Sequence, residues 1–331
     1  MSGSDRRAVV TGGAGFIGST LVDRLLRDGW SVVAVDSFDG FYPADRKRSN
    51  LADAIGDRGF GLAKVDTRDR ATVAEAFRAA APTVVFDLAA RAGVRPSLAD
   101  PESYIDVNVR GLQHTLAATA AAGARLVYAS SSSIYGDDPR RPFTEDQARG
   151  LPLSPYAATK IAGEALVHAH HAATGLPVGV ARLFTVYGPR QRPDLAIFTF
   201  ARQMLDHDPV VLFGEGALTR DYTYVDDVVE ALVRLASTEH PWLVVNVGSG
   251  RPVSTVEVVD QLERVLGIPA IRRSGPPQPG DVEATFADIT RAARELGWSP
   301  RVPFEEGIQR FCDWYRSEVG PSRSTGSPTP M

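Results

Sequence analysis

The sequence predicts an α/β fold, a doubly wound parallel sheet with a smaller, interleaved C-terminal lobe. Short apolar runs without polar alternation recur along the first 185 residues, and segments of helical length separate them. Such runs are typical of parallel strands that are buried on both faces by helices. A glycine-rich stretch, TGGAGFIGS at 11–19, joins the first run to the first amphipathic segment. The length of 331 residues is sufficient for one large core and a second lobe.

The expected helices and strands alternate along the chain. A first helix is predicted over about 19–29, where Leu21, Val22, Leu25 and Leu26 have helical spacing. After Gly188, a helix is expected at about 195–207, DYTYVDD at 221–227 begins another helix, and LVVNVGSG at 243–250 forms a strand. The earlier strands are expected at 8–10, 31–36, 61–66, 83–90, 124–131 and 177–184.

These elements divide the chain into two units and a tail. Residues 1–185, together with about 220–250, are expected to form a Rossmann domain that binds a dinucleotide. Residues 186–219 and 251–319 are expected to form a substrate-binding lobe, which contains a Pro/Gly-rich loop at 273–281. Residues 320–331 have the composition of a disordered tail.

Composition excludes several classes of function. The chain has 36 Lys and Arg against 40 Asp and Glu, a net charge of −4, so no bulk positive field attracts nucleic acid or an anionic membrane. Cys312 is the single cysteine, which forbids an internal disulfide or a cysteine-based zinc cluster and favours a cytoplasmic location. No apolar stretch is long enough to cross a membrane, and no secretory signal is recognisable.

The glycines of the first turn predict a dinucleotide site. Gly12, Gly15 and Gly18 follow a GxxGxxG spacing that lets backbone amides and a helix dipole meet a pyrophosphate. Asp36 ends the second strand, where a carboxylate accepts the two hydroxyls of an adenosine ribose and repels a 2′-phosphate, which favours NAD over NADP. A solvated strand-end residue is the alternative for Asp36. Asp66, after the third strand, either reaches the adenine or serves a turn.

Two residues that follow further along are candidates for proton transfer. Tyr156 and Lys160 lie four residues apart in YAATK and therefore share one helical face. The charges of Lys160 and NAD⁺ are expected to lower the pKa of Tyr156 from about 10 toward neutrality, so that it serves as a base. An ordinary helical pair is the alternative, but four serines at 130–133 end a predicted strand at the same ligand crevice.

Taken together, these motifs resemble the extended short-chain dehydrogenase/reductase superfamily. The resemblance spans about 8–315 and is greatest for nucleotide-sugar epimerases, with 36–51 and 182–198 most similar to UDP-glucuronate 4-epimerases. It implies NAD as cofactor, a UDP-sugar as substrate and a homodimer formed by the helices near 116–124 and after Tyr156. The motifs that carry it are TGGAGFIG, Asp36, LAARAGVRPS (88–97), NVRG (108–111), ASSSSIYG (129–136), SPYAATK (154–160) and RDYTYVDDV (220–228).

The resemblance also implies roles for individual residues. Ser131 is the hydroxyl of a Ser/Tyr/Lys triad, with Ser132 and Ser133 as competitors. Arg220 meets the nucleotide diphosphate, unless it pairs with Asp221 or Asp226, and Gln278 and Asp281 contact the nucleoside. Asp87 stands where family members often have His. The implied cofactor contacts are Gly12, Gly15, Phe16, Ile17, Gly18, Asp36, Asp66, Thr67, Leu88, Ala89, Ala90, Tyr156 and Lys160.

The residues around the triad favour one reaction within the family. Related 4,6-dehydratases carry Asp-Glu directly after the triad hydroxyl, where this chain has Ser132 and Ser133. Decarboxylases carry Glu just before the Tyr-Gly of the motif, where this chain has Ser133 and Ile134. Without these carboxylates, the 4-keto sugar is expected to turn over and receive hydride on its other face, which is 4-epimerisation.

A uronate substrate requires a further feature, because its 4-keto form is a β-keto acid that loses CO₂ readily. Hydroxyls of Ser132, Ser133 and Thr185, with Arg192 or Arg95 for charge, are expected to hold the carboxylate. The alternative for Arg192 is a solvated arginine beside Asp194. UDP-glucose or UDP-N-acetylglucosamine 4-epimerisation stays open, as does a non-catalytic NAD-binding regulator.

Three other signals are interpreted as structural. His168, His170 and His171 are assigned to a surface or dimer-facing helix and not to a metal site. Cys312, Trp314 and Tyr315 are expected to pack as one helix face, and Arg46, Lys47 and Arg48 to form a solvated basic face.

Overall fold

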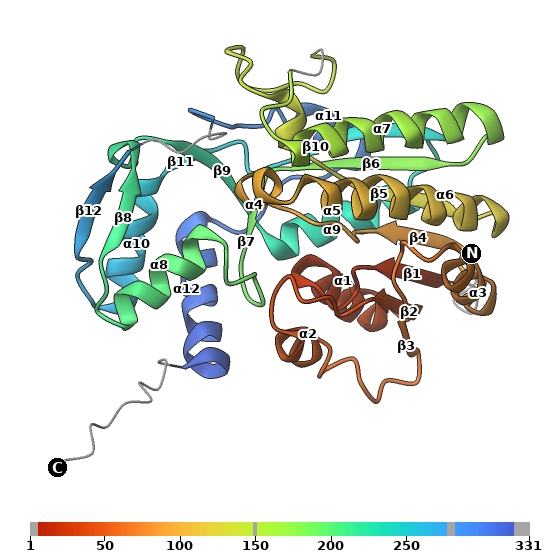
Figure 1. Ribbon diagram of the computed structural model, residues 1–331, viewed down its shortest axis with the longest axis horizontal. Coiled ribbons are helices and arrows are strands. Elements are labelled where there is room, and N and C mark those ends of the chain that lie inside the picture. Colours follow the sequence, from red (N-terminus) through yellow and green to blue (C-terminus); the bar gives the residue numbers. More distant parts are fainter. Residues whose placement is uncertain (1–5, 148–150, 277–281, 321–331) are drawn as a thin grey trace.

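A seven-stranded, fully parallel sheet forms the centre of the larger unit (Figure 1). The computed structural model describes residues 6–147, 151–276 and 282–320, so the predicted tail after Gly320 lies outside the described residues. The strand order is β10-β6-β5-β4-β1-β2-β3. These strands are β1 (Arg7–Thr11), β2 (Ser31–Asp36), β3 (Phe60–Lys64), β4 (Val84–Asp87), β5 (Arg125–Ser131), β6 (Val178–Leu183) and β10 (Trp242–Val247).

The strands form because their unbroken apolar runs supply two cores at once. Successive side chains point to opposite faces of a sheet, so Val10 packs into one core and Val9 into the other. Both residues are fully buried. The doubly wound α/β fold predicted from these runs is therefore confirmed.

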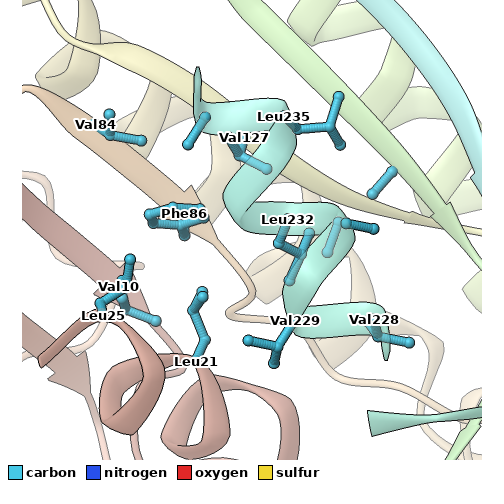
Figure 2. Close-up of a cluster of buried hydrophobic side chains, with 14 of the residues drawn as sticks. Val10, Leu21, Leu25, Val84, Phe86, Val127, Val228, Val229, Leu232 and Leu235 are labelled. Atoms are coloured by element: carbon cyan, nitrogen blue, oxygen red, sulfur yellow. The ribbon is translucent and has the colours of Figure 1, made fainter. Parts of the chain in front are cut away.

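Helices cover both faces of this sheet. One face carries α1 (Phe16–Arg27), α9 (Val225–Ser237) and α11 (Thr290–Leu296), and the other carries α3 (Arg70–Ala80), α6 (Leu112–Ala121) and α7 (Pro155–Thr174). Figure 2 shows Leu21 and Leu25 of α1 and Leu232 of α9 directed toward Phe86 of β4. Through this core, α1, which follows the glycine-rich turn, packs against the central strands.

A second lobe lies to one side of the large sheet and has its own core (Figure 1). Strand β9 pairs in parallel with β7 and antiparallel with β11, and β8 pairs in parallel with β12. The strands of the lobe are β7 (Thr185–Tyr187), β8 (Val210–Phe213), β9 (Thr219–Tyr224), β11 (Pro252–Ser254) and β12 (Arg272–Gly275), and its helices are α8 (Ala196–Leu205), α10 (Thr255–Leu266) and α12 (Phe304–Trp314).

The chain leaves the large sheet after β6 and returns with α9 and β10, so the lobe is interleaved, as expected. One expectation is wrong, because DYTYVDD does not begin as a helix. Its first residues lie in β9, and α9 starts at Val225. The segment DYTY pairs with neighbouring strands, and its side chains alternate between the two faces of the small sheet. The predicted helix at 195–207 is confirmed as α8.

The remaining helical segments are short. They are α2 (Ala44–Asn50), α4 (Val94–Ala99), α5 (Pro101–Ile105), the π-helical turns Asp106–Gly111 and Tyr315–Val319, and the 3₁₀ turns Ser132–Tyr135 and Gly214–Gly216. Among the described helices, none combines the length and apolar character needed to cross a membrane.

Candidate active site

A cavity of about 480 Å³ opens at the carboxyl ends of the central strands, within the range of small-molecule sites. It brings most of the predicted site residues together. Arg95 is not among its lining residues, since its guanidinium lies 4.9 Å from the centre of the Phe213 ring. Gln278 and Asp281 lie outside the described residues. The predicted residues that line the cavity are Gly12, Gly15, Phe16, Ile17, Gly18, Asp36, Asp66, Thr67, Leu88, Ala89, Ala90, Ser131, Ser132, Ser133, Tyr156, Lys160, Thr185, Arg192 and Arg220.

The turn between β1 and α1 requires its glycines. Gly12 has φ +66°, which disfavours other residues, and a Cβ on Gly18 would lie 2.1 Å from the Gly12 carbonyl oxygen. No side chain caps the N-terminus of α1 at Gly15, so the first amides of the helix have no capping partner. This open cradle, with the positive end of the helix dipole, fits a pyrophosphate.

Asp36 is buried at the end of β2, and the basic segment that follows is not a solvated face. Its Oδ1 accepts hydrogen bonds from the Phe38 amide at 2.8 Å and from Lys47 Nζ at 3.2 Å. Asp36 and Lys47 are each only 6% exposed, so the solvated alternatives for both residues are wrong. Lys47 lies on α2, which packs against α1, and its stem is therefore removed from water. The pair leaves the carboxylate partly neutralised beside the cavity.

The other residues near the predicted dinucleotide end are placed as follows. Arg46 lies over the Phe198 ring at 4.8 Å, which also removes it from the expected solvated face, whereas Arg48 pairs with Asp45 at an exposed site. Asp66 lines the cavity and also accepts the Arg68 amide at 2.9 Å, so it serves the turn and faces the cavity at once.

The proton-transfer candidates meet where β5 ends and α7 begins. Ser154 caps α7 by accepting the Ala157 amide at 3.1 Å, and this places Tyr156 in the first turn of the helix. Lys160, one turn later, donates from Nζ to the Ala129 carbonyl oxygen at 2.7 Å. The Ser131 hydroxyl, at the end of β5, hydrogen bonds with Tyr156. Of the three candidate serines, Ser131 is therefore the one that hydrogen bonds with the tyrosine.

Burial dominates the electrostatics of this group. It raises the pKa of Tyr156, while the Ser131 hydrogen bond and the Arg192 charge oppose that shift. Burial also lowers the pKa of Lys160 to about 8, and the carboxylates of Asp87 and Glu164 oppose that change. The protein alone thus shifts the pKa of Tyr156 away from neutrality, opposite to the direction expected with NAD⁺. Removal of a charged phenolate from water explains the difference.

Asp87 lies beneath the cavity and not in its lining. Thr11 Oγ1 donates to Asp87 Oδ1 at 2.5 Å, and Asp87 is 3% exposed. Burial raises the pKa of Asp87 to about 6, although the Thr11 bond and the charge of Lys160 lower it. The residue that departs from the family pattern therefore acts on the site through Lys160.

Arg192 enters the cavity from the loop between β7 and α8. Its Nε and Nη2 donate to Asp194 at 2.9 and 2.8 Å, and its guanidinium lies 5.4 Å from the Phe41 ring centre. The pairing with Asp194 agrees with the alternative of a solvated arginine beside that residue. The burial does not agree with it, because the Arg192 side chain is only 18% exposed. Nη1 has no hydrogen bond to any described residue and can meet an anionic ligand.

A family model described as the NAD dependent epimerase/dehydratase family matches residues 8–248. The chain belongs to this family. A UDP-glucuronate 4-epimerase of Thermodesulfobacterium geofontis is 38% identical over 315 residues, with 94% of this chain and 96% of the relative covered. The fold and the dependence on NAD thus have independent support.

Solved structures of family members share the fold closely. A UDP-glucuronic acid 4-epimerase from Bacillus cereus, in complex with UDP-glucuronic acid and NAD, has a TM-score of 0.89 at 34% identity and covers 94% of this chain and 99% of its own. A Thermus thermophilus UDP-glucose 4-epimerase complex with NAD has a TM-score of 0.86 at 35% identity, with 95% and 100% covered. The two neighbours differ in whether the named sugar carries a carboxylate.

Several residues of the site were not predicted from the sequence. Phe41 and Tyr42 line the cavity from the segment after β2, and the aromatic FDGFYP following Asp36 was the available signal. Asn108 joins loop to helix, because its side chain bonds the Arg91 backbone at 2.8 and 2.9 Å and donates to Thr159 Oγ1 at 3.0 Å. Asn108 begins the NVRG motif at 108–111 that contributed to the resemblance, but its bonding role was not predicted.

The structure also locates Arg220, the histidines of 168–171 and Cys312. Arg220 lines the cavity and donates from Nη1 to the Thr219 carbonyl at 2.8 Å. His168 and His171 pack on the Trp242 ring at 5.1 and 5.2 Å, and within the described ranges no group of His, Cys, Asp or Glu could hold a metal ion. Cys312 is buried in the core of the lobe, as expected for a packing helix.

Proposed function

We propose that this protein is a UDP-glucuronate 4-epimerase that retains NAD and recycles it within each turnover. The family and its relatives support NAD-dependent 4-epimerisation of a nucleotide sugar. The observation that carries the choice of a uronate is the Arg192 guanidinium, which lines the same cavity as Tyr156. A guanidinium there complements a carboxylate on the reacting sugar.

The catalytic group would be Tyr156, with Ser131 and Lys160. Tyr156 Oη removes the proton of the sugar 4-hydroxyl and later returns one, while Ser131 holds that oxygen in place. Lys160, fixed on the Ala129 carbonyl, supplies a positive charge beneath the site. NAD, held at the glycine cradle and Asp36, would supply the hydride acceptor and donor for C4 of the sugar. The 4-keto sugar would turn over between the two hydride transfers and present its other face, so that one base and one hydride site give inversion without loss of any substrate atom.

The glycine cradle, Asp36 and the ends of β3 and β4 would hold the dinucleotide. The backbone amides of the turn would bind the pyrophosphate, and Asp36 would accept hydrogen bonds from the ribose hydroxyls. Lys47, which donates to Asp36 at 3.2 Å, would offset part of the carboxylate charge. Arg220 would contact the diphosphate of the sugar nucleotide, with Gln278 and Asp281 near the nucleoside. On this assignment the Rossmann unit binds NAD and the interleaved lobe binds the nucleotide sugar.

The carboxylate of the uronate would be held by Arg192 with Ser132, Ser133 and Thr185. All four residues line the same cavity as Tyr156. A hydrogen-bonded, charge-paired carboxylate is disfavoured from releasing CO₂, because decarboxylation requires its desolvation and alignment with the 4-keto group. Arg95 is left out of this assignment because it lies over Phe213.

We further propose that the protein is a cytoplasmic homodimer. Leu98 and Ile105 are exposed apolar residues, at 48% and 53%, on α4 and α5. Both helices pack against α7, the helix that begins with Tyr156. Exposed apolar side chains next to this helix support a second copy of the chain as the covering partner.

The decisive experiment is incubation of the purified protein with UDP-glucuronate, without added NAD, followed by NMR and mass spectrometry. Formation of UDP-galacturonate at unchanged mass is expected. Loss of CO₂ would mean that the carboxylate is not protected. Conversion of UDP-glucose or UDP-N-acetylglucosamine alone would establish a neutral-sugar epimerase, and no turnover of any of them with added NAD would favour a regulator.

The variants Arg192→His and Thr185→Val test the uronate assignment directly. Each is expected to lower the rate with UDP-glucuronate or to release CO₂. Wild-type rate with full retention of the carboxylate in both variants would exclude the assignment.

A further inference from the structure

The loop between β7 and α8 carries Arg192 into the cavity in a conformation that needs support. Arg190 has φ +66°, a left-handed conformation that L side chains rarely adopt. Gly188, two residues earlier in the loop, has φ +140°. Within the loop, the Gln191 amide donates to the Gly188 carbonyl at 3.3 Å, and the Gly188 amide donates to Gln191 Oε1 at 3.2 Å. These long bonds alone are a weak restraint on a strained segment.

Arg190 supplies a stronger restraint through two ion pairs with distant segments. Its Nη1 lies 2.5 Å from Asp23 Oδ2 on α1, and its Nη2 lies 2.8 Å from Asp53 Oδ2 beyond α2. The Arg190 and Asp23 side chains are only 18% and 20% exposed, whereas Asp53 is 78% exposed. The shielded pair with Asp23 is therefore the principal anchor, since exposed pairs are weakened by solvent.

The helix that receives this anchor is also a wall of the cavity. Phe16, Ile17 and Gly18 of α1 line it at the end of the glycine turn, and Asp23 lies further along the same helix. Asp23, which pairs with Arg190, thus belongs to the helix that follows the glycine turn. Arg192 follows Arg190 by two residues, so a shift of the anchor shifts the guanidinium in the cavity.

We propose that Arg190 is a positioning residue that fixes Arg192 in the substrate site by anchoring its loop to Asp23 of α1. The inference rests on the proposed function in one respect, that the ligand of Arg192 is the uronate carboxylate. It adds a residue outside the cavity lining to the determinants of sugar selectivity. Helix α1 then positions both halves of the site, because it follows the glycine cradle and also anchors the Arg192 loop through Asp23.

The test compares Arg190→Ala, Arg190→Gly and Arg190→Lys. Glycine adopts the left-handed conformation freely, so Arg190→Gly removes the ion pairs without leaving strain. Lysine keeps one charge but cannot reach two carboxylates with a planar fork, so partial rescue is expected. Arg24→Ala is the matched control, because Arg24 also lies on α1 and pairs with two carboxylates, Asp28 and Glu230.

The first measurement is hydrogen exchange of the peptide covering 188–195, followed by mass spectrometry. The second is calorimetric binding of UDP-glucuronate and of UDP to NAD-loaded protein in a Tyr156→Phe background, where conversion of the sugar is expected to be about 10²–10⁴-fold slower. Arg190→Ala and Arg190→Gly are expected to speed loop exchange and to weaken UDP-glucuronate about tenfold, with UDP changed by less than about twofold. Arg24→Ala is expected to change neither.

Unchanged loop exchange in Arg190→Ala would overturn the proposal. Equal weakening of UDP and UDP-glucuronate, or the same changes in Arg24→Ala, would also overturn it, since both indicate a general structural effect. Failure of the proposed function has a different signature, because the wild type itself would then not convert UDP-glucuronate, whatever the loop exchange of the variants.

Discussion

Lys160 donates from Nζ to the carbonyl oxygen of Ala129 at 2.7 Å, which fixes its ammonium at the end of β5. The group is buried, and the carboxylates of Asp87 and Glu164 raise its pKa against that burial. Its charge at neutral pH therefore depends on carboxylates that do not line the cavity. This dependence leads to a pH prediction.

Asp87→Asn is expected to move the alkaline limb of the activity profile to lower pH. Lys160, with a pKa near 8, is charged below that value and loses its charge as the pH rises through it. Removing the Asp87 charge lowers this pKa further, so activity should be lost earlier. The pH dependence of kcat/KM measures the shift. An alkaline limb that coincides with that of wild type would contradict the role of Asp87; the exposed Asp45→Asn is the control.

Tyr156→Phe is expected to reduce turnover by about 10²–10⁴-fold, the usual contribution of a positioned acid or base. The ring still packs edge-on against Tyr104, with centroids 6.2 Å apart, so cofactor content and UDP binding should be retained. Product formation and calorimetric UDP binding check the two halves of this prediction. Turnover close to that of wild type would require another base.

Gly18→Ala is expected to give a protein that has lost most of its bound NAD. The added Cβ would lie 2.1 Å from the Gly12 carbonyl oxygen, so the cradle must distort. Cofactor released on denaturation, measured per protein chain, reports the loss. Gly40→Ala is a matched control, because nothing lies within 4 Å of its added Cβ. Full NAD content in Gly18→Ala would show that the cradle tolerates the shift.

Glu164→Gln is expected to reduce the free energy of unfolding by about 3–5 kcal/mol, because it leaves the buried Arg182 charge without its carboxylate. Glu164 accepts Arg182 Nε and Nη2, each at 2.9 Å, and also the Ser130 hydroxyl at 2.6 Å. Urea denaturation measures the change. Arg48→Ala, which breaks an exposed pair, should have little effect, and equal stability of the two variants would refute the argument.

The sequence was sufficient to predict the parallel sheet and the nucleotide end of the site. Unbroken apolar runs, such as VVAV after Ser31, require burial on both faces of the sheet. Gly18 is required because α1 starts against a tight turn, where a Cβ would meet the Gly12 carbonyl oxygen. These are local requirements, so they can be read from neighbouring residues. The short strands β7, β8, β9, β11 and β12 could not be read in this way, because their pairing depends on partners far along the chain.

Burial of charged residues likewise came only from the tertiary structure. Lys47 and Arg48 are adjacent and chemically similar, yet Lys47 is buried against Asp36 and Arg48 is exposed. Helix α2 packs against α1 along one side, and only that packing decides which of the two is removed from water. No local pattern of charge distinguishes them.

The sequence by itself predicted the fold class, the glycine turn and the shared helical face of Tyr156 and Lys160, because spacing along a helix fixes which side chains share a face. Ser131 came from the family resemblance, which left Ser132 and Ser133 as competitors. The tertiary structure alone decided that Arg192 enters the cavity, that Asp87 lies below it and that Arg190 reaches Asp23. Asp23 and Arg190 are separated by 167 residues, and the energy of such a pair depends on distance and burial in the folded chain.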